Sequence, residues 1–377
     1  MSADPMLDSR VAGQPSSVDD APRQPGPPPG FPVATAAPIT TIATLAVTGR
    51  NGHATPPHKI PLSRARAEAP ASASLLGTSL EPVLRQVCGG RLSEINWFRT
   101  DWQRGGAVTG YAAFRDEQNR LRDVVVKLPV PPSERHWLVM LQPFRHIVPT
   151  VYAHGEALGG YDFAWVVMER LSHGPLGAAW EGREFDLLAE AVGRFYAAAR
   201  DVPAVGEPMS RDWEKLCHLA REAVRDNNLP HAQRWRGTLK KTQRKLKHWL
   251  KVWNARPIDG WCHGDLHLGN AMSRDPAPQG PALLFDFAQT RVGHWVEDAI
   301  YFEHLYWARK DRLAGRKLCK QIADERKRHH LPVDSRWPQL AQIKRSLLAM
   351  SAPAQLRHDG DRHHLLAALE VLEAAVR

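Results

Sequence analysis

The chain has 377 residues and is basic, with 50 lysines and arginines against 40 aspartates and glutamates and a formal net charge of +10. This length exceeds one average domain, so two lobes and a tail are expected. The charge suits an anionic ligand, nucleic acid or an acidic membrane surface, and a solvated basic surface explains it as well. Four scattered cysteines without a CxxC pair argue against a disulfide framework and a zinc site, and they favour a reducing, cytoplasmic location.

Residues 1–75 predict a disordered tail. They are rich in Pro, Ala, Ser, Thr and Gly and show no sustained periodicity, so they cannot bury enough apolar surface to offset the cost of ordering the backbone. The N-terminus lacks the basic and apolar regions of a secretory signal. Residues 24–49 carry no charge, but six prolines and five threonines interrupt them, so we expect no membrane-spanning helix.

Residues 76–171 predict a small lobe built mainly from strands. It begins near Ser79 with a helix in which Leu80, Leu84 and Val87 recur at helical spacing, before the pair Gly89-Gly90. The expected strands are residues 92–100, 107–115, 122–128, 147–154 and 161–171, and the expected helix is 132–141, with Ser133 as its N-cap.

Residues 172–377 predict a larger, mainly helical lobe. Residues 184–200 carry their apolar side chains on one face of a helix. Further helices are expected over residues 211–227, 232–254, 296–310, 316–329, 337–350 and 362–376. Strands first and helices later are typical of an α+β protein.

The segment from Trp261 to Asn270 carries the main functional signal. It reads WCHGDLHLGN, and Asp286 follows Asn270 by sixteen positions, directly after an apolar run. ATP-dependent phosphoryl transfer needs one carboxylate to accept the proton of the attacking hydroxyl, and an amide and a second carboxylate to hold magnesium ions on the phosphates. We therefore predict Asp265 as the catalytic base and Asn270 and Asp286 as Mg²⁺ ligands.

This pattern resembles the aminoglycoside phosphotransferase and choline kinase family, whose members share the protein-kinase-like fold. The resemblance spans roughly residues 78–310. It implies a two-lobed fold, ATP and Mg²⁺ as cofactors, and a small-molecule hydroxyl as the acceptor. It assigns supporting roles to His263, which props the catalytic loop, and to Asp298, which braces the loop from the next helix. Ala288 stands where relatives often carry an acidic residue, which leaves the number of metal ions open.

Lys127 ends an apolar strand, where a lysine is costly to bury without an anionic partner. In the family, this position holds the α- and β-phosphates and pairs with a helix glutamate. Glu134 is the best candidate for that partner, and an exposed lysine on an edge strand is the alternative.

Two further segments are expected to contact the nucleotide. Gly105 and Gly106 lie in the loop between the first two strands, at the place of the phosphate-covering loop, although a plain hairpin turn would use the same residues. The resemblance makes residues 168–171 the connector between the lobes, so the backbone of Glu169 and Leu171 would meet adenine. The choice between ATP and GTP stays open.

A metallohydrolase is the alternative enzyme. His263, Asp265 and His267 form an HxDxH string that resembles a metal site, but zinc would need a further ligand. Such a ligand would come from His294 or from the group His358, Asp359, His363 and His364. This alternative leaves Asn270 and Asp286 unexplained.

A binding module is the non-enzymatic alternative. Residues 232–256 hold nine basic residues and no acid, with an apolar side, so they form a basic amphipathic helix suited to nucleic acid or acidic lipid. A lobe helix with a solvated basic face explains the same pattern, and no obligate nucleic acid is expected.

The sequence leaves the acceptor open. Aminoglycosides would need acidic side chains and choline would need aromatic faces. Candidates near the acceptor are Trp180, Trp295, Trp307, Glu297, Asp298 and Glu303. Protein substrates are a minor alternative, because the stretch between Asp286 and Asp298 is short for a regulatory activation segment.

Overall fold

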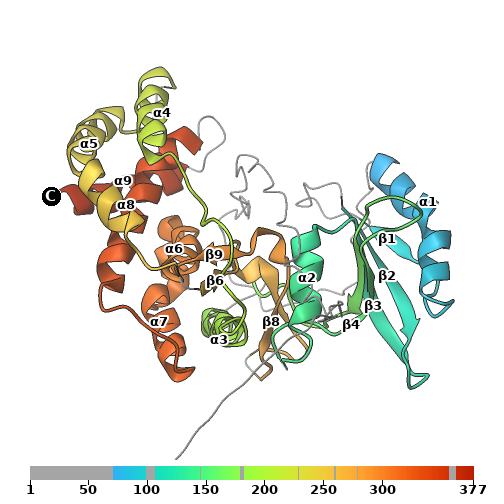
Figure 1. The fold of residues 1–377 in the computed structure, drawn as a ribbon. Coiled ribbons are helices and arrows are strands. Elements are labelled where there is room, and N and C mark those ends of the chain that lie inside the picture. Colours follow the sequence, from blue (N-terminus) through green and yellow to red (C-terminus); the bar gives the residue numbers. More distant parts are fainter. Residues whose placement is uncertain are drawn as a thin grey trace, which may run out of the picture. The chain divides into compact units, whose positions relative to one another are not determined.

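The structure of the protein, a computed structural model, describes residues 71–98, 107–144, 146–178, 182–227, 229–258, 260–277, 279–355 and 362–377, and of residues 71–74 the backbone alone (Figure 1). The tail expected over residues 1–75 therefore lies outside the described residues, except for its last five. Gly105, Gly106 and Trp180 also lie outside them.

The first part of the described chain is an antiparallel sheet with a helix against it. The sheet has five strands in the order β1-β2-β3-β5-β4. The helix α1 packs on β1 and β2 (Figure 1). The elements are α1 (Ala71–Val87), β1 (Asn96–Phe98), β2 (Val108–Arg115), β3 (Leu121–Leu128), α2 (Pro132–Met140), β4 (Val151–Gly155) and β5 (Trp165–Glu169). Alternation of buried and partly buried residues along β3 gives this sheet one covered face.

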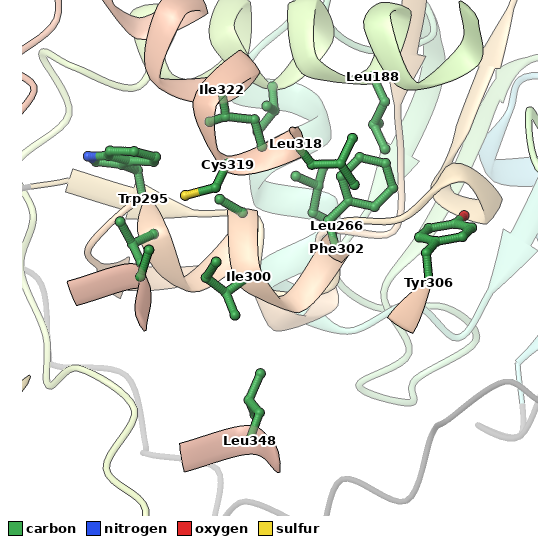
Figure 2. Close-up of a cluster of buried hydrophobic side chains, with 14 of the residues drawn as sticks. Leu188, Leu266, Trp295, Ile300, Phe302, Tyr306, Leu318, Cys319, Ile322 and Leu348 are labelled. Carbon is green, nitrogen blue, oxygen red and sulfur yellow. The ribbon is translucent and has the colours of Figure 1, made fainter. Parts of the chain in front are cut away.

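The second part is mainly helical, as expected for an α+β protein with a kinase-like fold. Its helices are α3 (Arg183–Ala198), α4 (Trp213–Asp226), α5 (Ala232–Asn254), α6 (Val296–His304), α7 (Leu318–Arg328), α8 (Trp337–Gln355) and α9 (Arg362–Val376). Leu188 of α3, Phe302 of α6 and Ile322 of α7 are fully buried and meet in its core (Figure 2). Among the described residues, no helix combines the length and the apolar character needed to cross a bilayer.

Two short antiparallel strand pairs position the segment from Trp261 to Asn270. They pair β6 (Gly260–Cys262) with β9 (Arg291–Gly293) and β7 (Ala271–Ser273) with β8 (Ala282–Leu284). Because Ala271 is opposite Leu284, Asn270 comes opposite Phe285, whose N–H donates to the Asn270 carbonyl at 3.2 Å. The pairing thus brings Asn270 beside the residue that precedes Asp286.

Several expected boundaries were wrong. The helix predicted to start near Ser79 begins at Ala71, and β4 and β5 are shorter than predicted, because turns such as that between Leu158 and Tyr161 take up their ends. The helix predicted over residues 296–310 ends at His304, and a 3₁₀ segment, Trp307–Leu313, with a non-helical Arg309, follows it.

Ser133 was also predicted wrongly as an N-cap. The N-cap position of α2 belongs to Pro131, which has no side-chain oxygen to accept a hydrogen bond. The Ser133 hydroxyl instead donates to the carbonyl of Ala288 at 3.2 Å. It therefore connects α2 to the segment that follows Asp286.

The basic helix α5 is a helix of the large lobe. Trp235 and Leu239 on its apolar side are fully buried, and α5 contacts α4, α8 and α9. This face is therefore not available for insertion into lipid, whereas the basic face, with Lys240 and Lys247, is exposed.

Leu84 tests how α1 is held. Its side chain is fully buried, so Leu84→Ala should lower the free energy of unfolding by about 2–5 kcal/mol in urea denaturation. Leu75 in the same helix is 63% exposed, so Leu75→Ala should change it by less than about 0.5 kcal/mol. Equal losses for the two variants would contradict the packing of α1 on the sheet.

Candidate active site

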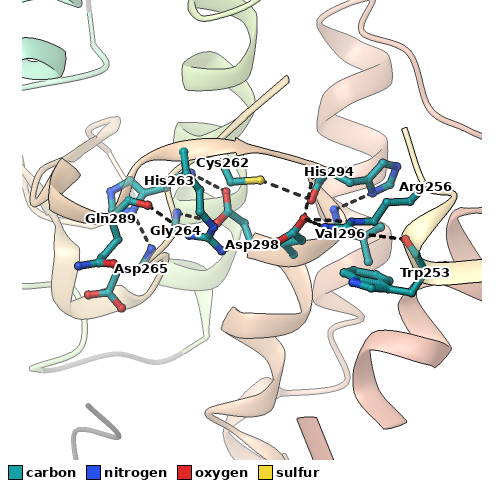
Figure 3. A network of polar contacts seen from close by, with 12 residues as sticks. Trp253, Arg256, Cys262, His263, Gly264, Asp265, Gln289, His294, Val296 and Asp298 are labelled. Atoms are coloured by element: carbon teal, nitrogen blue, oxygen red, sulfur yellow. Dashed lines mark hydrogen bonds and ion pairs between the residues drawn. The ribbon is translucent and has the colours of Figure 1, made fainter. Parts of the chain in front are cut away.

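The loop after β6 is held by one buried carboxylate. Asp298, in the first turn of α6, is fully buried, and its oxygens accept from the backbone N–H of His263 at 2.7 Å and of Gly264 at 2.9 Å (Figure 3). The Tyr196 hydroxyl donates to the same carboxylate at 2.9 Å. These three donors compensate a charge that would otherwise be costly to bury. Asp298 thus links α6 to the loop through hydrogen bonds.

Gly264 is required by the backbone. Its φ is +86°, which L side chains rarely adopt, and a Cβ there would lie 2.0 Å from the Gln289 carbonyl oxygen. A glycine at this position lets the loop pass directly over the segment that precedes β9.

His263 is a neutral, buried support for the loop. Its Nδ1 accepts from the Asp265 N–H at 3.4 Å, so Nε2 carries the hydrogen and donates to the Phe285 carbonyl at 3.1 Å. Burial lowers the pKa of His263, in agreement with the neutral ring. With both nitrogens engaged, His263 cannot bind zinc. The part of the chain that the structure describes holds no group of three or more His, Cys, Asp or Glu residues able to bind a metal.

Asp265 is a partly exposed carboxylate with three neighbours. The Tyr301 hydroxyl donates to Oδ1 at 2.5 Å, and Asn270 Nδ2 donates to Oδ2 at 3.2 Å. His267 Nδ1 accepts from the Gly269 N–H, so its protonated Nε2 faces Oδ2, 3.6 Å away. Burial would raise the pKa of Asp265, but His267 and Tyr301 outweigh it and hold that pKa below its ordinary value. Asp265 is therefore ionised at neutral pH.

Asn270 and Asp286 form an oxygen-rich pair. Asn270 Nδ2 also donates to the Asp265 carbonyl at 2.9 Å, which orients the side chain; its Oδ1 accepts no hydrogen bond from the residues that the structure describes. Asp286 has φ 62° and ψ 60°, a left-handed conformation that is uncommon for a residue with a side chain. An amide oxygen and a carboxylate are the ligands that Mg²⁺ prefers, so these residues fit that ion.

Lys127 and Glu134 form an ion pair. Lys127 Nζ lies 2.7 and 2.8 Å from the two carboxylate oxygens of Glu134, which is 1% exposed. Burial opposes the charge of Lys127, but the carboxylates of Glu134 and Asp286 raise its pKa above the ordinary value. Asp286 therefore lies close enough to act on the pair. The Ser133 contact described above ties α2 to the same segment.

The expected adenine contacts are only partly available. The side chain of Glu169 accepts from Arg274 at 2.6 Å through both oxygens, and its N–H donates to the Thr150 carbonyl. Glu169 could therefore meet a nucleotide only through its carbonyl. Within the described ranges, the N–H of Leu171 makes no hydrogen bond, so it can act as a donor.

The acceptor candidates do not form an exposed acidic or aromatic site. Trp295 and Trp307 are buried, and Trp180 is outside the described residues. Arg256 and Arg291 ion-pair with Glu297, and Arg345 donates to both oxygens of Glu303 at 2.6 and 2.7 Å. The expectation that these groups supply a cation-binding surface is not supported.

Sequence reasoning missed Tyr301 as a neighbour of Asp265. Tyr301 follows Asp298 by three positions, so the two share a face of α6, and both point to the catalytic loop. That spacing was a usable signal. A cavity of about 350 Å³ lies elsewhere, and none of the candidate catalytic or metal-binding residues lines it.

Comparison with known proteins shows which solved structures this chain resembles. A solved aminopropanol kinase associated with a microcompartment has a TM-score of 0.51 and 15% sequence identity, over 78% of this chain and 94% of that chain. A putative aminoglycoside phosphotransferase from Ralstonia eutropha JMP134 has a TM-score of 0.49 and 13% identity, over 78% and 97%. Spectinomycin phosphotransferase, solved with ADP and spectinomycin, has a TM-score of 0.47 and 10% identity, over 79% and 93%.

No protein with a curated description matches this chain. The family model described as the phosphotransferase enzyme family (APH) matches residues 106–317, which is more than half of the chain and contains Lys127, Asp265, Asn270 and Asp286. The protein therefore belongs to the phosphotransferase enzyme family.

Proposed function

We propose that this protein is a kinase that uses ATP and Mg²⁺ to phosphorylate a hydroxyl group of a small molecule. The observation that carries this proposal is the contact between Asn270 and Asp265 at 3.2 Å, together with the hydrogen bonds on either side of Asp286 that tie Phe285 to Asn270 and Ala288 to α2. A carboxylate for the acceptor, two oxygen ligands for metal and one lysine for phosphate thereby surround one region.

Asp265 would orient the acceptor hydroxyl. Its Oδ1 already accepts a hydroxyl, that of Tyr301, so this oxygen is placed to receive an alcohol. As the acceptor oxygen bonds to the γ-phosphorus, the bond to the β–γ bridging oxygen breaks and the hydroxyl proton passes to Asp265. An ionised aspartate is a weak base, so its contribution is mostly alignment, and it accepts the proton late.

Asn270, Asp286 and Lys127 would hold the phosphates. Asn270 Oδ1 and the Asp286 carboxylate would hold Mg²⁺, which supplies positive charge for the β- and γ-phosphates when bound. Glu134 fixes Lys127 Nζ for contact with the α- and β-phosphates. The free N–H of Leu171 supports a role as a donor to adenine.

The exposed basic face of α5 supports a secondary contact with an anionic surface. That contact and the cytoplasmic location stay predictions.

Asp265→Asn should abolish turnover while preserving nucleotide binding. Loss of the carboxylate removes alignment and proton acceptance, so kcat should fall at least about a hundredfold in an assay of ADP release. The dissociation constant for Mg-ATP, measured by calorimetry, should stay within about twofold of the unmodified protein. Asp201→Asn, at an exposed site paired only with Arg200, is the control. Loss of nucleotide binding in Asp265→Asn would show that the base assignment is wrong.

Asp286→Asn should weaken nucleotide binding that depends on Mg²⁺ and leave nucleotide binding without Mg²⁺ unchanged. Removing the charged ligand should weaken ATP binding more than about tenfold in the presence of Mg²⁺. With a chelator present, the variant and the unmodified protein should bind ATP alike. An equal loss under both conditions would instead indicate that Asp286 supports the fold.

A further inference from the structure

Four basic side chains gather beside the catalytic loop. They are Arg211, Arg256, Arg291 and Lys344, here called the basic cluster. Lys344 Nζ lies 5.1 Å from the ring centres of both Trp213 and Trp253. The guanidinium of Arg211 lies 5.7 Å from the Trp213 ring, and that of Arg256 lies 4.2 Å from the Trp253 ring. Two indole rings thus connect three of the four cations.

Arg291 joins the basic cluster to the catalytic loop. A Cβ placed on Gly264 would lie 2.3 Å from Arg291 Nη1, so this guanidinium packs directly against the residue before Asp265. Its Nη2 lies 3.6 Å from Glu297 Oε2. Figure 3 shows Asp298 on the backbone N–H groups of His263 and Gly264, and Arg256 on the carbonyl of Trp253.

The basic cluster has more cations than acidic partners. Among the described residues, Glu297 is the one carboxylate in an ion pair with it, through Arg256 at 3.0 Å and Arg291 at 3.6 Å. The oxygens of Asp298 and Asp265 accept hydrogen bonds from the groups described above. Burial lowers the pKa of Lys344 to about 7; Glu297 opposes this shift and the three arginines add to it. The interior here is therefore electropositive.

Two guanidinium groups of the basic cluster keep unused donors. Arg211 makes no side-chain hydrogen bond or ion pair within the described ranges of the chain, although it is partly buried. Arg291 Nε is buried without a hydrogen-bond partner. Leaving buried donors unpaired is costly, so such groups usually serve a ligand or a strained state. The backbone beside Arg211 is fixed, because Asp212 caps α4 by accepting from the Lys215 N–H at 2.8 Å.

Arg291 lies beside the loop that carries Asp265, and Arg211 belongs to the same basic cluster. Glu297 and Tyr301 are four residues apart on α6, so they lie on one face, about 6 Å apart along the axis. Arg291 lies 3.6 Å from Glu297, one turn of α6 before Tyr301, and Arg211 shares the Trp213 ring with Lys344 of the same cluster. Burial and Asp265 raise the pKa of Tyr301, and Arg211 and Arg291 act in the opposite direction. The Tyr301 hydroxyl donates a hydrogen bond to Asp265 Oδ1.

We propose that the acceptor carries an anionic group, a carboxylate or a phosphate, which Arg211 and Arg291 bind while the acceptor hydroxyl replaces that of Tyr301 on Asp265. The proposal rests on the proposed kinase function and names the substrate class. A cationic acceptor would need free acidic groups, but Glu297 and Glu303 are already paired with arginines. An anion would instead satisfy the unused guanidinium donors.

Binding of small probes that differ in charge tests the proposal. The probes are glycerate, glycerol 3-phosphate, glycerol and ethanolamine, titrated at constant ionic strength with Mg²⁺ and a non-hydrolysable ATP analogue present. At least one of the two anions should bind more than about tenfold tighter than glycerol, and the comparison of the two tells carboxylate from phosphate. Preference for glycerol or ethanolamine, or no binding of either anion, overturns the proposal.

Variants of Arg211 separate charge from fold. Because Arg211 makes no hydrogen bond within the described residues, Arg211→Gln should fold normally and weaken binding of the preferred anion about ten- to a hundredfold. Arg211→Lys should restore part of the affinity. Arg236→Gln, at an exposed position on α5, is the matched control. Unchanged anion affinity in Arg211→Gln also overturns the proposal.

The failure of the proposed function would look different. If the unmodified protein does not bind Mg-ATP, the kinase assignment fails. If it binds Mg-ATP and prefers neutral or cationic probes, only the substrate class fails.

Discussion

Without a cation hydrogen-bonded to it, a buried carboxylate is stable only when enough hydrogen-bond donors reach it. Asp298 meets this condition with backbone N–H groups of the catalytic loop. The N–H groups of His263 and Gly264 and the hydroxyl of Tyr196 converge on it. The loop therefore cannot move away from α6 without leaving a buried charge unpaired. The position of Asp265 follows from this constraint, since it is the next residue along the loop.

The helix α6 also organises what surrounds Asp265. Glu297, Asp298 and Tyr301 lie within about one turn of this helix, and they contact the arginines, the loop and the carboxylate of Asp265, respectively. A second constraint comes from the other direction, because Ser133 links α2 to the segment after Asp286. The Lys127–Glu134 pair and the candidate metal ligands are thus tied to one another through short contacts, as kinase chemistry requires.

The sequence predicted the parts of the site that depend on local spacing. Asn270 and Asp286 flank the β7–β8 strand pair, and Glu134 stands in the first turn of the helix after the strand of Lys127, so both placements follow from short-range spacing. The contacts of Tyr301 and Arg211 depend on how distant helices pack, which no local pattern specifies. The ends of strands were mispredicted for a similar reason: a bridge between Leu158 and Tyr161 replaces strand pairing with a turn.

Family membership and substrate charge are separate questions, because a fold supports many acceptors while the side chains around the acceptor choose among them. In this protein, the acids that a cationic acceptor would need are already neutralised by Arg256, Arg291 and Arg345. Arg211 has no such partner among the described residues. The interaction of buried charges is strong at short range and weakly screened by salt. The basic side chains beside Asp265 therefore oppose the binding of ammonium groups and favour acceptors that carry a negative charge.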